Sequence, residues 1–338
     1  MADHINHDLD EPLALMTRAA EEALSHWDGA FQNLALVKYR ENAVYSVHNE
    51  AGKRFALRVH RLGYHSDAEL LSELQWMSAL ASSGISVPGI VPARDGSLFV
   101  KVALPDARPL QVDILEWLTG EPIGSIEDLS SCSAEDLQLA YFKVGELAAR
   151  IHNFGETWTA PDGFVRHAWD TQGLIGQDPF WGRFRDLPAL KKHLKLIDAA
   201  CAKAETELAR LGRSPAVYGM IHADFVPENL LEADSRIRLI DFDDAGFGWH
   251  LFELATALYF HLDTPHYDVV FSALLTGYWS ARHLSEDHVA MLPLFLLLRS
   301  ITYLSWVQTR RETTTAMELT PMFVERTIRL AENYLLQA

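Results

Sequence analysis

The chain has 338 residues, more than a single typical hydrophobic core holds, so two domains are expected. Hydrophobic residues make up 49% and charged residues 22%, as in ordinary globular proteins, and the formal net charge of −17 disfavours nonspecific binding to nucleic acid or to an anionic membrane. The two cysteines, Cys132 and Cys201, lie too far apart in sequence for a disulfide framework or a zinc site, and they fit a reducing compartment.

Secretion and membrane insertion are not expected from the sequence. Residues 1–12 carry four acidic side chains and no apolar core, so we expect no secretion signal. The longest apolar run, 291–306, is interrupted by Pro293 and Arg299, and we expect it to fall short of a membrane span. The sequence therefore predicts a soluble, cytoplasmic protein and leaves the oligomeric state open.

The first third of the chain predicts a helix followed by an antiparallel sheet. Apolar residues at helical spacing indicate one amphipathic helix, and alternating residues indicate short strands joined by turns. The expected helix covers residues 11–26, and the expected strands cover 34–37, 43–48, 54–59, 97–102 and 112–115. Side chains alternate along a strand, so Leu57 and Val59 share one face of the third strand and Arg58 lies on the other.

Arg58 is a candidate for binding nucleotide phosphates. A basic residue in this place is typical of the strand that lies over ATP, although the usual residue is lysine. A helix predicted over residues 66–81 carries Glu73, which could pair with Arg58 and fix its direction. Taken by itself, Glu73 is more readily explained as one of many exposed helical acids, but its place after a strand arginine favours the pairing.

The segment 116–120 is the expected hinge, which places an N-lobe at residues 1–115 and a C-lobe at 116–338. In such a hinge the backbone meets adenine, so Glu116 and Leu118 are candidate nucleotide-binding residues. Beyond residue 134 the pattern becomes mainly helical. The expected helices cover 137–154, 187–211, 251–262, 267–282, 286–311 and 317–336.

The most informative motif is His222-x-Asp224-x-x-x-x-Asn229, followed by a predicted hairpin and by Asp241-Phe242-Asp243. A hairpin returns the chain to the same end, so the oxygen donors of both segments converge. Phosphoryl transfer needs a carboxylate to orient the acceptor hydroxyl and oxygen ligands for magnesium. We therefore expect Asp224 to be the catalytic base and Asn229 with Asp241 to bind Mg²⁺.

Neighbouring residues of this motif have weaker predictions. Asp243 could be a second metal contact or merely a loop residue, and Asp244 is expected to be solvated. His222 is expected to hold the loop rather than to take part in the chemistry. Ile240, next to the metal loop, is a candidate nucleotide-binding residue.

The acceptor pocket is expected beside Asp224, with the candidate wall residues Arg166, His167, Asp170, Trp249 and Arg299. The basic pair at 166–167 could hold the carboxylate of an acidic acceptor. The alternatives are that Trp249 is a core aromatic and that Arg299, inside an apolar helix, pairs internally.

The chain resembles the aminoglycoside phosphotransferase and choline kinase superfamily over nearly its whole length. The apolar run 217–221 that leads into His222, together with the Asp-Phe-Asp loop, carries the specific part of the resemblance. The subgroup of type II homoserine kinases and bacterial stress-response Ser/Thr kinases is the most similar, on the segments 55–59, 73–76, 166–170 and 240–248. The resemblance implies an α+β, two-lobed protein-kinase-like fold, with a small antiparallel-sheet N-lobe and a larger, mainly helical C-lobe.

Three departures from the superfamily pattern accompany the resemblance. No G-x-G-x-x-G lies between the first two strands, Arg58 replaces lysine, and Glu253 stands where relatives commonly have aspartate. We expect Glu253 to be part of the scaffold.

The function predicted from these residues is ATP- and Mg²⁺-dependent transfer of the γ-phosphate to a hydroxyl of a small molecule. One alternative is a Ser/Thr protein kinase of the stress-response type, although no recognisable activation segment follows Asp243. A second is a nucleotide-binding pseudokinase scaffold. A third, a metal hydrolase that uses His222, Asp224 and Asp241, is disfavoured because such sites need more histidines.

Overall fold

The computed structural model describes residues 3–39, 42–104, 108–126 and 132–337. They form two compact units: unit 1 comprises Met1–Thr119 with Ala160–Val165, and unit 2 comprises Gly120–Thr159 with Arg166–Ala338. Each unit is described by itself.

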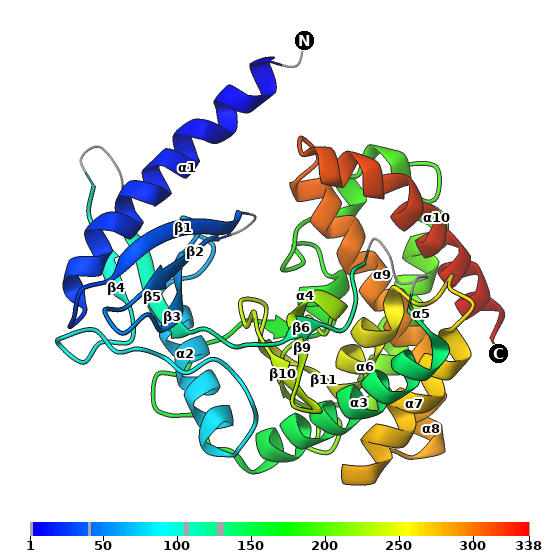
Figure 1. Cartoon of the computed structure of the whole chain (residues 1–338). Helices are drawn as coiled ribbons and strands as arrows, with labels where there is room; N and C mark the ends of the chain where they lie inside the picture. The colour runs from blue at the N-terminus through cyan, green and yellow to red at the C-terminus, as the bar shows by residue number, and fades with distance from the viewer. Residues whose placement is uncertain (1–2, 40–41, 105–107, 127–131, 338) are drawn as a thin grey trace. The chain divides into compact units, whose positions relative to one another are not determined.

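Unit 1 is built on a five-stranded antiparallel sheet with the strand order β1-β2-β3-β5-β4 (Figure 1). The strands are β1 Gln32–Tyr39, β2 Ala43–His48, β3 Arg54–Val59, β4 Val100–Val102 and β5 Leu110–Glu116. Two helices accompany the sheet, α1 Asp3–Ala23 and α2 Asp67–Ser82, and a short 3₁₀ turn, η1 Leu24–His26, follows α1. The helix predicted over 11–26 therefore ends at Ala23.

The core of unit 1 lies between α1 and one face of the sheet. Leu57 and Val59 of β3 are fully buried there with Ala19 and Ala20 of α1 and with Ile114 of β5. Because strand side chains alternate, Arg58 lies on the opposite face, where it contacts α2.

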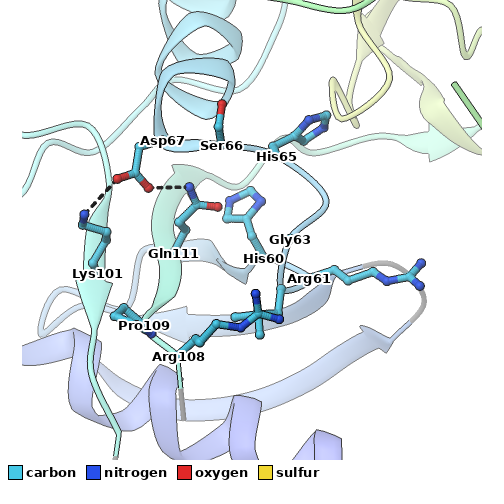
Figure 2. Close-up of a pocket in the computed structure, with 11 residues that line it drawn as sticks. His60, Arg61, Gly63, His65, Ser66, Asp67, Lys101, Arg108, Pro109 and Gln111 are labelled. Carbon is cyan, nitrogen blue, oxygen red and sulfur yellow. Dashed lines mark hydrogen bonds and ion pairs between the residues drawn. The ribbon is translucent and has the colours of Figure 1, made fainter. Parts of the chain in front are cut away.

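The start of α2 is fixed by a capping box. The Ser66 side chain accepts a hydrogen bond from the backbone N–H of Glu69, and the Glu69 side chain accepts one from the Ser66 backbone. A pocket of about 280 Å³ lies in unit 1 beside this helix start, lined also by residues of β4 and β5 and of the segment after β3 (Figure 2).

Unit 2 is mainly helical. Its helices are α3 Ala134–Thr157, α4 Thr171–Ile175, α5 Leu194–Leu211, α6 His250–Tyr259, α7 Tyr267–Ala281, α8 Glu286–Val289, α9 Leu292–Thr309 and α10 Thr314–Leu336. Short 3₁₀ helices occur at η2 Phe184–Asp186, η3 Pro188–Leu190 and η4 Pro227–Asn229. Every residue of α6 is buried, so this helix forms the centre of the unit.

Two glycines let α3 and α7 pack closely. A Cβ atom added at Gly145 of α3 would lie 2.0 Å from the carbonyl oxygen of Leu274, and one added at Gly277 of α7 would lie 1.8 Å from that of Phe142. Real Cβ atoms do not approach so closely, so the packing of these two helices requires glycine at both places.

Two small sheets position the loops of unit 2. One has the order β10-β9-β6 and the other β7-β11-β8. Their strands are β6 Glu121–Pro122, β7 Ala168–Trp169, β8 Tyr218–Ile221, β9 Leu230–Ala233, β10 Arg236–Leu239 and β11 Gly246–Trp249. The β9–β10 hairpin, in which Arg236 pairs with Ala233, confirms the hairpin predicted after Asn229.

Two helix predictions were wrong at their boundaries. The helix expected over 187–211 begins only at Leu194, because Pro188 starts a 3₁₀ turn instead. The helix expected over 286–311 is divided into α8 and α9, and Pro293 occupies the first turn of α9, where the missing N–H costs no hydrogen bond.

The helical stretch Glu286–Thr309 is long and apolar enough to cross a membrane by length and composition, contrary to the expectation for this run. In its most apolar window, 72% is buried inside the protein. Burial of this extent is the property of a core helix.

Candidate active site

The catalytic-loop motif begins where β8 ends. Ala223 has a positive φ of 65°, a conformation that costs a non-glycine residue energy. Glu253 of α6 offsets this strain, because its carboxylate accepts hydrogen bonds from the backbone N–H groups of His222 (2.9 Å) and Ala223 (2.6 Å). Burial raises the pKa of Glu253 even though His222 and these N–H groups favour its charged form. The scaffold role expected of Glu253 agrees with these contacts.

Asp224 is held on both of its oxygens. Its Oδ1 accepts a hydrogen bond from the Arg299 guanidinium at 2.8 Å, and its Oδ2 accepts one from the Asn229 side-chain amide at 2.8 Å. The Arg299 side chain is fully buried, whereas that of Asp224 is 21% exposed. The carboxylate is therefore fixed in direction and still reachable by a hydroxyl group.

The metal-loop motif is bonded to the catalytic loop. The backbone N–H of Ile240 donates to the carbonyl of Asn229 at 3.0 Å. His222 Nδ1 accepts the Asp224 backbone N–H, so we assign the proton to Nε2, which lies 3.1 Å from the Ile240 carbonyl. Asp241 follows directly with an exposed side chain and a positive φ of 68°. The local sequence thus gathers the predicted base and both predicted metal ligands.

The donor set fits magnesium. The Asn229 amide nitrogen is bonded to Asp224, so its Oδ1 is the atom suited to a cation, and Asp241 offers a carboxylate. Amide and carboxylate oxygens are hard ligands of the type that Mg²⁺ prefers. His222 does not add a nitrogen ligand to this set, because both of its ring nitrogens are bonded to backbone groups.

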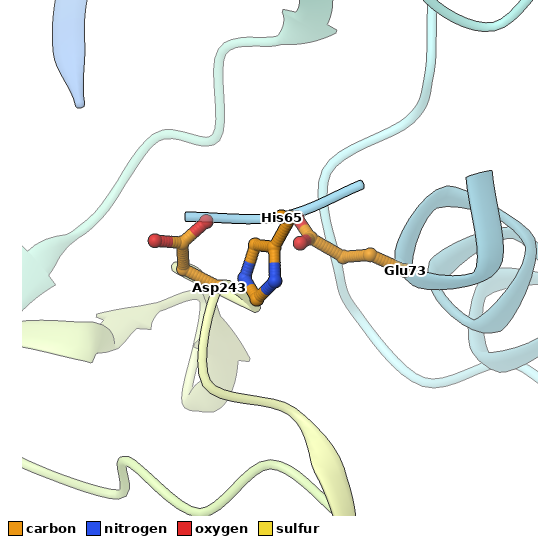
Figure 3. A group of neighbouring side chains, drawn as sticks. All are labelled: His65, Glu73 and Asp243. Carbon is orange, nitrogen blue, oxygen red and sulfur yellow. The ribbon is translucent and has the colours of Figure 1, made fainter. Parts of the chain in front are cut away.

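Arg166 supports the loop that follows Asp241. Its guanidinium, almost entirely buried, donates to the carbonyl oxygens of Ala245 at 2.5 Å and Asp243 at 2.6 Å. Asp243 is itself buried, and its side chain is drawn in Figure 3. These bonds give Arg166 a structural task that the sequence did not reveal.

The other predicted acceptor residues are also engaged in the fold. The His167 ring stacks on Phe180 at 3.6 Å between centroids. Asp170 caps α4 through the N–H groups of residues 172 and 173, and it pairs with Arg213. Trp249 is buried, and its indole donates to the Gly212 carbonyl. None of these contacts supports acceptor binding, and that role stays a prediction.

Asp244 was expected to be solvated, and it is only partly exposed. Its side chain accepts the indole N–H of Trp181 at 2.9 Å, and its backbone carbonyl accepts that of Trp169. The Trp181 ring also lies 4.9 Å from the Arg299 guanidinium carbon, and Arg299 bonds Asp224. A second carboxylate, partly exposed, is thereby held near the predicted base. Sequence reasoning missed Trp181 because a single tryptophan carries no local signal of its partners.

Unit 1 holds Arg58 between two carboxylates. Arg58 donates to Glu73 of α2 at 2.9 Å, and it binds both oxygens of Asp113 on β5 at 2.9 and 2.7 Å (Glu73 is drawn in Figure 3). Asp113 is fully buried; burial would raise its pKa, but the charges of Arg58 and His60 outweigh burial and lower it. The sequence pointed to the pair with Glu73 but missed Asp113, whose signal was an acid inside an apolar strand.

The segment at the end of β5 carries the predicted adenine contacts. The backbone N–H of Glu116 donates to the Gly89 carbonyl at 2.7 Å, and its side chain pairs with Lys53. Leu118 is partly buried, and between them the ring of Trp117 stacks on the Arg54 guanidinium at 3.5 Å. The segment is therefore packed in place from within unit 1.

An oriented carboxylate beside amide and carboxylate oxygens of the kind that bind magnesium is typical of enzymes that transfer phosphoryl groups. The comparisons agree. Residues 35–285 match the model of the phosphotransferase enzyme family. The solved structure of the microcompartment-associated aminopropanol kinase is 34% identical with a TM-score of 0.82, and it covers 94% of this chain and 97% of its own.

Curated relatives are similar along most of their length. Homoserine kinase of Rhizobium meliloti (strain 1021) is 26% identical over 83% of this chain and 82% of its own. Amicoumacin kinase of Bacillus subtilis (strain 168) is 22% identical over 82% of this chain and 80% of its own. The chain belongs to the phosphotransferase enzyme family, and the predicted protein-kinase-like α+β fold is confirmed. It is an ATP-dependent kinase that uses a divalent metal and phosphorylates a hydroxyl of a small molecule.

Proposed function

We propose that the acceptor is a small amino alcohol and that Asp224 orients its hydroxyl for attack on the γ-phosphate of ATP. The observation that carries this proposal is the position of Asp224, which is fixed by Arg299 and Asn229 and is still partly exposed. A carboxylate held in one direction can accept the hydroxyl proton as the bond to phosphorus forms.

In this proposal Asn229 and Asp241 hold Mg²⁺, which screens the phosphate oxygens. Arg58 binds the phosphates, and Glu116, Leu118 and Ile240 contact the nucleotide. Glu73 and Asp113 fix the direction of the guanidinium. Their two negative charges also mean that Arg58 grips the nucleotide less strongly than a lone cation does, so the metal provides most of the charge compensation.

The preference for an amine follows from the charges around Asp224. The two arginines near the catalytic loop are already bonded, Arg299 to Asp224 and Arg166 to backbone carbonyls. A carboxylate on the acceptor would therefore compete with existing bonds. Asp244, partly exposed and held by Trp181, is suited to an ammonium group instead. The similarity to an aminopropanol kinase supports the same class of acceptor.

A panel of acceptors read by ADP release tests this proposal. We expect turnover with 1-amino-2-propanol or ethanolamine, and much less with glycerol, which lacks the amine, or with homoserine, which adds a carboxylate. Faster turnover of homoserine than of every amino alcohol would contradict the proposed acceptor class.

The roles of Asp224 and Asp244 are separated by two variants. Asp224→Asn should lower kcat about 10²- to 10⁴-fold, the usual contribution of a general base, and should leave nucleotide affinity nearly unchanged. Asp244→Asn should raise KM for the amino alcohol about tenfold or more, with a smaller effect on kcat. Asp268→Asn, at an exposed site in the first turn of α7, is the matched control. Normal kcat in Asp224→Asn would remove that residue from the base role.

The cytoplasm is the proposed location. Cys132 and Cys201 are both free thiols, and this state fits a reducing compartment.

A further inference from the structure

The pocket of unit 1 carries positive charge in a strongly acidic protein. Arg61, Lys101 and Arg108 line it with a single carboxylate, Asp67, so its fixed charges are net positive, whereas the whole chain has a net charge of −17. Asp67 pairs with Lys101 at 2.8 Å and accepts a hydrogen bond from the Gln111 amide at 2.8 Å. Local positive charge of this kind attracts anions.

The side chains of this pocket come from several segments of unit 1. Figure 2 shows Lys101 of β4 and Gln111 of β5 reaching the same Asp67 carboxylate, with the ring of His60 next to Gln111. Lys101 and Gln111 are also directly paired in the β4–β5 register. The pocket therefore has a fixed frame, and Arg61 and Arg108, which are both among its lining residues, are exposed.

His60 is the second observation that points to a ligand. It lines the pocket and is only 3% exposed. Its Nε2 lies 2.8 Å from Asp113 Oδ2, whereas its buried Nδ1 has no hydrogen-bond partner among the described residues. Buried polar atoms normally have a partner, so a ligand in the pocket is a natural partner for this nitrogen.

His60 also connects the pocket to Arg58. Asp113 Oδ2 accepts from both His60 Nε2 at 2.8 Å and Arg58 at 2.7 Å. We propose that the pocket binds a small phosphate-bearing anion, and that His60 transmits its occupancy through Asp113 to Arg58.

The transmission follows from competition for one oxygen. The P–O–H group of a phosphate-bearing anion can donate to Nδ1 of His60, and this bond polarises the ring so that its Nε2–H becomes a stronger donor. The polarised ring of His60 binds Asp113 more strongly and weakens the hold of Asp113 on Arg58. Arg58 is then available to nucleotide phosphates, so the bound anion increases affinity for ATP. This last step rests on the proposed role of Arg58, whereas anion binding itself does not.

Calorimetry with the full-length protein tests the site. Inorganic phosphate is titrated in the presence of saturating Mg²⁺ and a non-hydrolysable ATP analogue, so that the nucleotide site is filled. We expect one phosphate per chain in the wild type and at least tenfold weaker binding in Arg61→Gln/Arg108→Gln. The control Lys191→Gln/Arg236→Gln makes the same change in net charge at exposed sites of unit 2 and should bind phosphate normally.

Three outcomes overturn the anion site. They are competition between phosphate and the ATP analogue, unchanged binding in the pocket variant, and equal losses in the two double variants. A second titration uses a phosphorylated amino alcohol in place of inorganic phosphate. Tighter binding than that of phosphate identifies the reaction product as the ligand of the pocket, and equal binding identifies the free phosphate ion.

The coupling has its own test. Coupling between two sites is reciprocal. Phosphate should therefore increase the affinity for the ATP analogue by about fivefold or more, and the analogue should increase the affinity for phosphate by the same factor. In His60→Gln the amide can still bond Asp113 but has no ring nitrogen to receive the bond from the anion, so phosphate should bind without changing ATP affinity. If neither ligand changes the affinity for the other in the wild type, the coupling is overturned, but the proposed anion site is not. Normal ATP affinity in Arg58→Ala instead contradicts the proposed function.

Discussion

Arg299 supplies a permanent positive charge to Asp224 from inside α9, a helix that has no other charged residue. Burying a guanidinium costs several kcal/mol, and bonds to Asp224, to the Ala223 carbonyl and to the Tyr303 hydroxyl offset this cost. Ala223 is also the strained residue of the loop. Arg299 therefore acts as a positioning residue for both the base and the backbone that carries it.

Replacing Arg299 should change the pH dependence of catalysis. In Arg299→Lys the positive charge remains, but the hydrogen bonds that the guanidinium makes to several partners at once are lost. In Arg299→Met the charge is lost as well. We expect kcat to fall about tenfold or more in both variants. Only in Arg299→Met should the acidic limb of the kcat profile move to higher pH, by about one unit, because a carboxylate without its cation is protonated more easily.

Arg326 is the control for this prediction. It is 5% exposed and pairs with Asp263 at 2.8 Å in the same unit. Arg326→Met should lower stability without moving the pH profile. An unmoved acidic limb in Arg299→Met would limit Arg299 to a purely structural role.

The contact between the helices α3 and α7 depends on two glycines, which carry no side chain. The methyl group of Gly145→Ala would collide with a backbone carbonyl of α7, which cannot rotate out of the way. We expect the free energy of unfolding to fall by about 1–3 kcal/mol, the usual cost of overpacking. Leu139→Ala, at a position of α3 that is 57% exposed, should change it by less than about 0.5 kcal/mol. Urea denaturation measures both, and equal stability of the two variants would contradict the tight packing.

Local patterns predicted most elements and the β9–β10 hairpin well, and distant partners poorly. The motif from His222 to Asn229 and the β9–β10 hairpin depend on residues close in sequence, so their geometry follows from turn and strand rules. Asp224 and Arg299 are 75 residues apart, and Arg58 and Asp113 are 55 apart. Which buried acid meets which buried base is decided by packing, for which one sequence gives no rule.

The same limit explains why the structural contacts of the predicted acceptor residues were not foreseen from the sequence. Arg166 and His167 were predicted to bind the acceptor because a basic pair in a loop has little packing reason to exist. The carbonyls of the 242–245 turn provide that reason, since a turn leaves backbone acceptors that a guanidinium can satisfy. Asp244 was passed over because its two tryptophan partners lie more than 60 residues away.

For the whole molecule, buried histidines should make stability depend on acidity. Burial lowers the pKa of His152 and His250 well below the usual value, and it lowers the pKa of His261 to about 4. The unfolded chain takes up protons on these rings below about pH 6.5, but the folded chain does not. Stability is therefore fully present above about pH 6.5 and is lost as the pH falls toward about 4.

The variant His261→Gln tests this dependence. Each such histidine contributes about 1.4 kcal/mol per pH unit between the two pKa values, so the variant should show a slope smaller by about that amount between pH 6 and pH 5. The measurement is the free energy of unfolding in urea across this range. His283→Gln, at an exposed position, should keep the wild-type slope. Identical slopes in all three proteins would contradict the assignment.

The arginine at position 58 has a consequence for chemical labelling. Reagents that carry an electrophile into a nucleotide site usually acylate or sulfonylate the amine of a strand lysine. A guanidinium stays protonated and is a poor nucleophile, and here both Glu73 and Asp113 hold it. Amine-directed probes of that kind should leave this position unmodified, and adduct mapping should find them on exposed lysines such as Lys53 instead.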